Sequence, residues 1–190
     1  MTRIVTVLTE GFADWETALL NAVAHAFYGV ETSFASPGGR AVTSSGGMRV
    51  TPDRALEGLD VADYDAIVVN GGTIWQSEAA PDLRQLLQTA REQGKVIGVI
   101  CDATVAAARA GLLDHVAHTS NGVGYLDTTG YAGAGLYRDS DAAVSDQRVI
   151  SAPATAPVSF MAEILRALGL ADENLGIYLG MHAAEHRHAG

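Results

Sequence analysis

Lys95-Val-Ile-Gly-Val-Ile-Cys101-Asp-Ala-Thr-Val-Ala-Ala-Ala-Arg109 changes its pattern at Cys101, the only cysteine of the chain. The residues before Cys101 form an apolar run without a helical period, which is typical of a buried strand. The residues after it are rich in alanine, the residue with the highest helix propensity. The pattern therefore predicts a strand, a sharp turn and a helix, with Cys101 in the turn.

Strands and helices alternate on both sides of this stretch. Apolar runs bounded by turn residues predict the other strands, and apolar residues at helical spacing, such as Trp15, Leu19, Leu20, Val23 and Phe27, predict the other helices. The expected strands cover residues 4–8, 30–35, 48–51, 65–69 and 148–152, and the expected helices lie at about 15–27, 81–93, 156–168 and 172–185. The glycine-rich residues 116–146 predict only short strands and turns.

This alternation predicts an α/β fold, with a mainly parallel sheet covered by helices on both faces and a single domain over residues 1–190. Functional sites of such folds lie beyond the carboxyl ends of the strands. Three segments with distinctive chemistry follow predicted strands: Glu10 to Glu16, Gly71 to Thr73, and Cys101 itself. We therefore expect these segments to meet at one edge of the sheet.

The composition restricts the classes of partner. The chain has 12 Lys and Arg against 22 Asp and Glu, a net charge of −10, so we expect neither nucleic acid nor an anionic membrane as its partner. A lone cysteine forms no internal disulfide, which favours a reducing cytoplasm. The sequence enters its first strand directly after Met1 and has no apolar run of the roughly 20 residues that span a bilayer.

Cys101 is a candidate nucleophile. A thiol attacks as its thiolate, and the amides and dipole at a strand-to-helix turn lower a cysteine pKa from about 8.5. We therefore expect a lowered thiol pKa at Cys101. The alternative is that Cys101 is a small apolar residue of the core.

Glu16 lies in the first turn of the predicted first helix, where its carboxyl group could hold or exchange a proton with the thiol. The alternative is that it only complements the helix dipole. The backbone amides of Gly72, Thr73 and Asp102 are candidates to stabilise negative charge on a substrate oxygen, although a glycine pair also simply forms turns. The Asp102 side chain is expected to cap the next helix, or, near the sulfur, to raise the thiol pKa.

Other polar and aromatic residues are weaker candidates. His118 and Asn121 follow the cysteine helix and could point into the cleft, or lie at a surface strand end. Trp15 and Trp75 are expected near its mouth. A metal site from His182, Glu185 and His186 at helical spacing is possible in principle, but we expect no metal and no cofactor.

The quoted segments resemble the ThiJ/PfpI superfamily over nearly the whole chain. This superfamily includes the parkinsonism-associated protein deglycase and is related to the class I glutamine amidotransferases. The matching motifs are Glu10-Gly-Phe-Ala-Asp-Trp-Glu16, Val69-Asn-Gly-Gly72, Val99-Ile-Cys101, Ala110-Gly-Leu-Leu-Asp114 and Ser151-Ala-Pro153. The resemblance implies a flavodoxin-like sandwich that is usually dimeric, with Cys101 as the reactive cysteine at a nucleophile elbow and Glu16 as the acid bonded to it.

The chain also departs from its relatives. Members that resemble peptidases have a histidine directly after the cysteine, where this chain has Asp102, so we expect no peptidase activity. Many relatives have a histidine where this chain has Asn121. True glutamine amidotransferases have glycines two residues to either side of the cysteine, where this chain has Val99 and Ala103, so glutamine is not the expected substrate.

Three hypotheses for function follow. The first is a hydrolase or hydratase in which Cys101 adds to a small electrophile, such as an amide, an α-oxoaldehyde adduct or an isonitrile, while Glu16 handles the proton. The second is an oxidative-stress sensor or protein-protective factor that acts by oxidation of Cys101 without turnover. The third is a scaffold or binding module whose dimer surface matters more than its cysteine.

Overall fold

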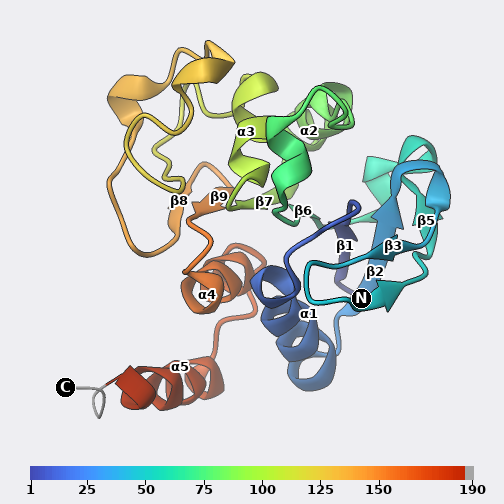
Figure 1. The fold of residues 1–190 in the computed structure, drawn as a ribbon. Coiled ribbons are helices and arrows are strands. Elements are labelled where there is room, and N and C mark those ends of the chain that lie inside the picture. Colours follow the sequence, from blue (N-terminus) through green and yellow to red (C-terminus); the bar gives the residue numbers. More distant parts are fainter. Residues whose placement is uncertain (187–190) are drawn as a thin grey trace.

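The computed structural model describes residues 1–186, and within them a seven-stranded sheet forms the centre of the molecule (Figure 1). Its strands are β1 (Arg3–Val7), β2 (Glu31–Ser36), β5 (Arg54–Ala55), β6 (Ala66–Val69), β7 (Val96–Ile100), β8 (Val144–Asp146) and β9 (Val149–Ala152). Their order across the sheet is β5-β2-β1-β6-β7-β9-β8. All neighbouring pairs are parallel except β8 with β9, which confirms the predicted mainly parallel sheet.

The order β2-β1-β6-β7-β9 is that of flavodoxin-like folds, in which the direction of winding reverses beside the first strand. A separate antiparallel hairpin, β3 (Val42–Thr43) and β4 (Arg49–Val50), lies outside this sheet. The strand expected at residues 48–51 therefore exists, but it belongs to the hairpin rather than to the central sheet.

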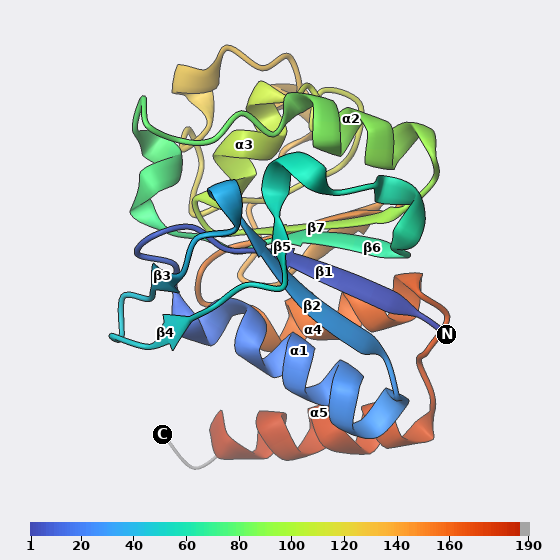
Figure 2. The ribbon, with the colours of Figure 1, turned by 90° about the vertical axis from the view of Figure 1, so that its right-hand side faces the viewer.

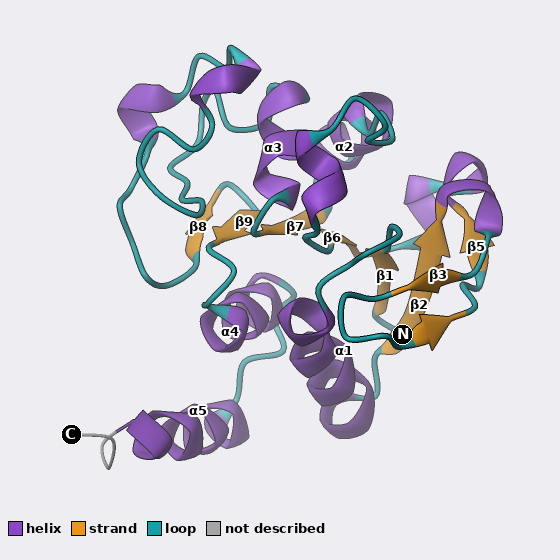
Figure 3. Ribbon diagram, viewed as in Figure 1, coloured by secondary structure: helices purple, strands orange, loops and turns teal. Residues whose placement is uncertain are grey.

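Helices cover both faces of the sheet, as predicted. Figure 2 shows α2 (Arg84–Glu92) and α3 (Ala103–Arg109) on one face and α1 (Asp14–Tyr28) and α4 (Pro157–Ala167) on the other, with α5 (Glu173–His186) outside them. The remaining helical turns are 3-10 segments: η1 (Pro37–Gly39), η2 (Leu56–Gly58), η3 (Val61–Asp63), η4 (Thr73–Gln76), η5 (Asp127–Thr129) and η6 (Ala134–Leu136). Between α3 and β8 the chain is mostly loop (Figure 3).

The central strands β6 and β7 are buried along their whole length, as expected for a parallel sheet covered on both faces. Gly98 in the middle of β7 permits close packing of α4. A Cβ at this position would lie 2.7 Å from Ile164 Cδ1 and 2.9 Å from Phe160 Cζ. The glycine in the apolar run before Cys101 is thus a packing requirement.

The first helix faces the core with a different set of residues from the predicted one. Leu20 and Val23 are buried as expected, but Trp15 and Phe27 are 55% and 69% exposed. The buried face of α1 instead includes the polar residue Glu16, which lies at the sheet edge. Hydrophobic periodicity does not predict the buried face of α1 correctly, because the polar residue Glu16 takes one of the buried positions.

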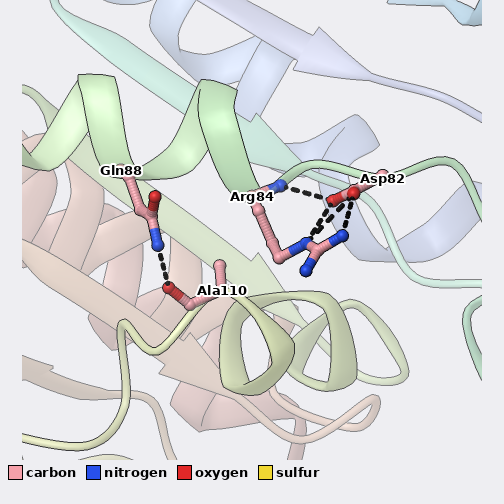
Figure 4. A network of polar contacts seen from close by, with 4 residues as sticks. All are labelled: Asp82, Arg84, Gln88 and Ala110. Atoms are coloured by element: carbon pink, nitrogen blue, oxygen red, sulfur yellow. Dashed lines mark hydrogen bonds and ion pairs between the residues drawn. The ribbon is translucent and has the colours of Figure 1, made fainter.

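The helix α2 begins at Arg84, three residues later than predicted. Asp82 accounts for the shift, because its Oδ1 accepts the Arg84 amide at 2.9 Å and its carboxylate also pairs with the Arg84 guanidinium (Figure 4). One turn later, Gln88 Nε2 donates to the carbonyl of Ala110 at 3.0 Å and ties α2 to the end of α3. No helix within residues 1–186 is long and apolar enough to cross a membrane.

Candidate active site

Cys101 occupies the turn between β7 and α3. Its φ of 58° lies in the left-handed region, which few residues other than glycine adopt. The Cys101 amide donates to the carbonyl of Ala152 at 2.9 Å, so β9 fixes the turn. The side chain is half-buried. The thiol thus stands at the carboxyl edge of the central strands, where the sequence predicted it.

Glu16 reaches the same place from the first turn of α1. Its side chain is fully buried, and its Oε2 accepts the amide of Gly71 at 2.7 Å. A second bond, from the Ala13 amide to the Gly71 carbonyl at 3.1 Å, ties the start of α1 to the end of β6. Glu16 Oε1 has no conventional hydrogen-bond partner among the described residues. Burial raises the pKa of the carboxyl group, and its interaction with the neighbouring Cys101 thiol lowers this pKa in part.

Gly71 is the residue that allows this arrangement, whereas the predicted charge-stabilising amides of this segment were those of Gly72 and Thr73. A Cβ on Gly71 would overlap with Glu16 Oε2 and lie 2.7 Å from Cys101 Cβ. The carboxyl group and the cysteine therefore both pack directly against the Gly71 backbone. The two successive glycines after β6 predicted outward-facing amides or a simple turn, but not the close packing of Glu16 and Cys101 against Gly71.

Burial and charge set the protonation of the pair. Burial, with a smaller contribution from the negative charge of Asp102, raises the pKa of Glu16 to about 7. Burial, followed by the negative charge of Glu16, raises the pKa of Cys101 to about 12. The expected lowering of the thiol pKa is therefore wrong: α3 has only seven residues, and two acidic neighbours oppose ionisation of the sulfur.

Asp102, the residue after the cysteine, forms a hydrogen-bond network with Asn121 and Tyr125 beside the sulfur. Its Oδ1 accepts a hydrogen bond from the Tyr125 hydroxyl and another from Asn121 Nδ2, the latter at 3.1 Å. The Tyr125 hydroxyl in turn accepts a bond from Gln76 Nε2 at 2.6 Å. The Asp102 side chain makes no capping bond to α3, so the predicted capping role is wrong.

Asn121 connects this network to the thiol. Its Nδ2 lies 3.5 Å from Cys101 Sγ, and its Oδ1 accepts the amide of Ala154 at 3.0 Å. Asn121 thus points toward the sulfur, as one sequence hypothesis expected. As a neutral amide, it offers a hydrogen-bond donor but no general base. The bond between Tyr125 and Asp102 has no local sequence signal, because it depends on how the loop that carries Tyr125 folds.

His118 does not face the site, contrary to the hypothesis that it points into the cleft. It is fully buried, with Nδ1 2.8 Å from the Val116 carbonyl and Nε2 3.2 Å from the Tyr131 hydroxyl. The rings of Tyr131 and Tyr137 pack edge-on against it at centroid distances of 5.4 and 5.7 Å. Burial lowers the pKa of His118 and keeps the imidazole neutral. His118 is a satisfied core residue.

Trp75 is also not at the mouth. It is fully buried, and its indole Nε1 donates to the Asn70 carbonyl at 2.9 Å, so it supports the loop that carries Gly71 from beneath. Gly72 packs against Gly11, whose carbonyl oxygen would lie 3.1 Å from a Cβ on Gly72. The amides of Gly72, Thr73 and Asp102 remain predictions as donors to a substrate oxygen.

Within the described part of the chain, no group of three or more His, Cys, Asp and Glu side chains could hold a metal ion. Of the three residues considered for a metal, His182 packs edge-on against Tyr178. The side chains of Glu185 and His186 lie outside the described residues.

Comparison with known proteins places this geometry in a family. The model of the DJ-1/PfpI family matches residues 2–167. A crystal structure of a DJ-1 superfamily protein from Agrobacterium tumefaciens is 44% identical in sequence, with a TM-score of 0.95 over 98% of this chain and 100% of that one.

Two curated proteins of Bacillus subtilis are also similar, and both are named uncharacterised proteases. YoaZ is 31% identical over 129 residues, which is 67% of this chain and 61% of the relative, so the match spans less than two thirds of its length. YdeA is 29% identical over 172 residues, which is 88% of this chain and 84% of the relative.

Proposed function

The chain belongs to the DJ-1/PfpI family, and we propose that it is a cysteine-dependent hydrolase or hydratase of small molecules. In this proposal Cys101 is the nucleophile, the turn that holds it is a nucleophile elbow, and Glu16 is its proton partner. The observation that carries the proposal is the buried Glu16 carboxyl group beside the thiol, held by the Gly71 amide at 2.7 Å.

The raised thiol pKa determines how the reaction must start. At neutral pH the sulfur is protonated, so the thiol proton passes to the Glu16 carboxylate as the carbon–sulfur bond forms. At an amide or α-oxoaldehyde carbonyl, the electrons of the carbon–oxygen double bond move to the oxygen, and Glu16 keeps the proton for the group that leaves. At an isonitrile, the proton passes from Glu16 to the carbon that now bonds the sulfur, which gives a thioimidate. A pKa of about 7 suits Glu16 to both proton transfers.

Water completes the reaction. For an isonitrile, water adds to the sulfur-bound carbon, the carbon–sulfur bond breaks and Cys101 regains its proton, which is a net hydration. For an amide, the amine leaves with a proton from Glu16 before water attacks, which is a hydrolysis. An α-oxoaldehyde adduct offers a carbonyl carbon to the same attack. The three substrate classes share an electrophilic carbon and need no metal in this scheme.

A small substrate is favoured over a peptide. The two Bacillus subtilis relatives carry the name protease, which supports hydrolysis as the reaction class. In this chain the residue after the cysteine is Asp102, whose carboxylate is engaged by Tyr125 and Asn121. An acidic residue in that place cannot act as the imidazole base of a Cys-His pair.

The alternative is a sensor in which Cys101 is oxidised to a sulfinate beside Glu16. Peroxide reacts with thiolates, and the raised pKa of Cys101 keeps the thiolate population low. A raised thiol pKa opposes attack by the thiolate in either hypothesis. We prefer the enzyme because there Glu16 takes the thiol proton as the new bond forms, so no free thiolate is required.

We also propose a cytoplasmic homodimer that binds neither nucleic acid nor membrane. The net charge of −10 and the single cysteine support the location and the excluded partners. An apolar groove of about 330 Å³ between α1 and α5, bordered by the exposed residues Phe27, Ile177 and Met181, supports a second copy as the partner. Light scattering of the purified protein measures its mass in solution.

Turnover by variants tests the proposal. The wild type, Cys101→Ser and Glu16→Gln are assayed against methylglyoxal, small amides and isonitriles. We expect the serine variant to lose all measurable turnover and the glutamine variant to lose about a hundredfold or more. Glu10→Gln is a matched control, because this glutamate lies in the same segment but bonds the Thr43 amide instead.

Mass spectrometry after graded peroxide separates the sensor from the enzyme. A stable gain of two oxygens on Cys101, without turnover of any substrate in the panel, contradicts the enzyme and supports the sensor. Unchanged turnover in the Cys101→Ser variant contradicts both.

A further inference from the structure

Trp15 is a large aromatic residue at the edge of the site that the proposed reaction does not use. It directly precedes Glu16 in α1, yet its side chain is 55% exposed. The indole Nε1 donates to the Ala154 carbonyl at 3.2 Å, which holds the ring against the loop between β9 and α4. Trp15 therefore presents a fixed apolar surface to solvent, and such surfaces bind ligands well because little side-chain freedom is lost.

The anchor of Trp15 leads directly to the sulfur. The Ala154 amide donates to Asn121 Oδ1 at 3.0 Å, and Asn121 Nδ2 lies 3.5 Å from Cys101 Sγ. Three successive hydrogen bonds thus connect the indole ring to the thiol. This path, together with the place of Trp15 directly before Glu16, puts the ring beside the residues that surround the thiol.

The charged groups that act on the sulfur, and the residue that precedes Trp15, are acidic. Glu16 and Asp102 are the charged groups that act on the Cys101 pKa, and both raise it. Asp14 precedes Trp15, and a hydrogen bond from Ser44 lowers the pKa of its carboxyl group, so it is ionised at neutral pH. A substrate with a carboxylate or phosphate would be repelled by these groups.

We propose that Trp15 is a specificity-determining residue, whose ring binds the apolar or aromatic group of an uncharged electrophile while the reactive carbon of that electrophile contacts Cys101. This inference rests on the proposed function for the role of the sulfur. It adds the substrate class: neutral molecules with an aryl or alkyl group, in preference to anionic molecules of similar reactivity.

Alkylation of Cys101 tests the inference without any need for turnover. Iodoacetamide, N-phenyl iodoacetamide and iodoacetate each transfer a carbon to the sulfur with loss of iodide and of the thiol proton. Their second-order rates with the protein are measured by mass spectrometry and divided by their rates with N-acetylcysteine. We expect the phenyl reagent to be favoured about fivefold over iodoacetamide and iodoacetate to be the slowest.

Variants assign the preference to Trp15. Trp15→Ala is expected to abolish the phenyl preference while the iodoacetamide rate stays within about twofold. Trp15→Phe keeps a ring and is expected to keep most of the preference. Met48→Ala is the matched control, because Met48 is a large exposed apolar residue in the turn between β3 and β4, outside the groove between α1 and α5. It is expected to behave like the wild type.

Several results would overturn the inference. They are a wild type without phenyl preference, a Trp15→Ala variant that slows all three reagents equally, and fastest reaction with iodoacetate. A fall in assembly mass for Trp15→Ala in light scattering would also overturn it, because a second copy would then cover the ring. Turnover without phenyl preference defeats the inference alone, whereas a phenyl preference without any turnover defeats only the proposed enzyme.

Discussion

Glu16 and His118 are both buried titratable groups, but they differ in how their polar atoms are satisfied. His118 has a partner at each ring nitrogen and two tyrosine rings around it. Glu16 has one oxygen bonded to the Gly71 amide and another without a conventional partner among the described residues. Complete satisfaction marks His118 as structural, whereas the incomplete bonding of Glu16 beside a thiol marks a reactive site.

The largest effect is expected from Gly71→Ala, which fills the space that the Glu16 cluster needs. The added Cβ would overlap with Glu16 Oε2 and crowd Cys101 Cβ. We expect a loss of about 2 to 4 kcal/mol in the free energy of unfolding and a strong change in Cys101 alkylation rate. Urea denaturation measures the former and iodoacetamide the latter.

Gly58→Ala is the control for this change, because a Cβ at Gly58 meets nothing within 4 Å and its φ is not in the left-handed region. It is expected to leave both quantities nearly unchanged. Equal stability of the Gly71→Ala and Gly58→Ala variants would show that the packing around Glu16 is loose.

The second effect concerns Glu16 and the pH dependence of stability. Burial raises the pKa of Glu16 from 4.5 to about 7 in the folded protein, so the folded state binds an extra proton between these pH values. Stability is therefore lost as the pH rises through this window. The loss is about 3 kcal/mol at most.

Glu16→Gln cannot ionise and should lack this loss. We expect the variant to gain stability relative to the wild type between pH 4.5 and pH 7, measured by urea denaturation at several pH values. A constant difference between the two proteins across that range would contradict a raised pKa of Glu16.

The difference between the site of Glu16 and Cys101 and the surroundings of His118 was only partly predictable from the sequence. The strand, turn and helix around Cys101 follow from hydrophobic pattern, because β7 is buried along its whole length. Glu16 was predicted from its place in the first turn of a helix after a strand, since parallel strands bring such turns to one edge. Both inferences depend on local patterns that the fold preserves.

The roles of His118 and Trp15 depend on segments that local patterns do not determine. His118 faces Tyr131 and Tyr137 because the glycine-rich loop after α3 folds back over it. Trp15 is exposed because the polar Glu16 takes a place on the buried face of α1. The raised thiol pKa also depends on tertiary structure, since it results from burial and from carboxylates on two different elements.

His118 should respond to pH in the opposite direction from Glu16. Burial lowers its pKa below the 6.5 of a free histidine, so the unfolded state binds the proton more readily. The stabilisation is present above pH 6.5 and is lost as the pH falls through the folded pKa. We expect His118→Phe to lose about 1 to 3 kcal/mol at pH 7, because the hydroxyl of Tyr131 and the carbonyl of Val116 lose their partner.

The same variant should have a smaller deficit at acidic pH, because phenylalanine does not titrate. Its Cys101 alkylation rate is expected to match that of the wild type. A large change in that rate would show that His118 contributes to the site of Cys101 and Glu16, and is not a purely structural residue.

The smallest effect is expected from Asn121→Ala, which removes a neutral hydrogen-bond donor close to the sulfur. At 3.5 Å the bond from Asn121 Nδ2 to Cys101 Sγ is weak, but it lowers the thiol pKa and so opposes the effects of burial and of Glu16. Without it, we expect alkylation by iodoacetamide at pH 9 to slow about two- to fivefold. Asn174→Ala is the control, because this amide bonds Asp172 at the start of α5. Faster alkylation in the Asn121→Ala variant would mean that the Asn121 side chain shields the sulfur more than it stabilises the thiolate. The neighbours of Cys101 would then protect it, as those of His118 do, rather than activate it.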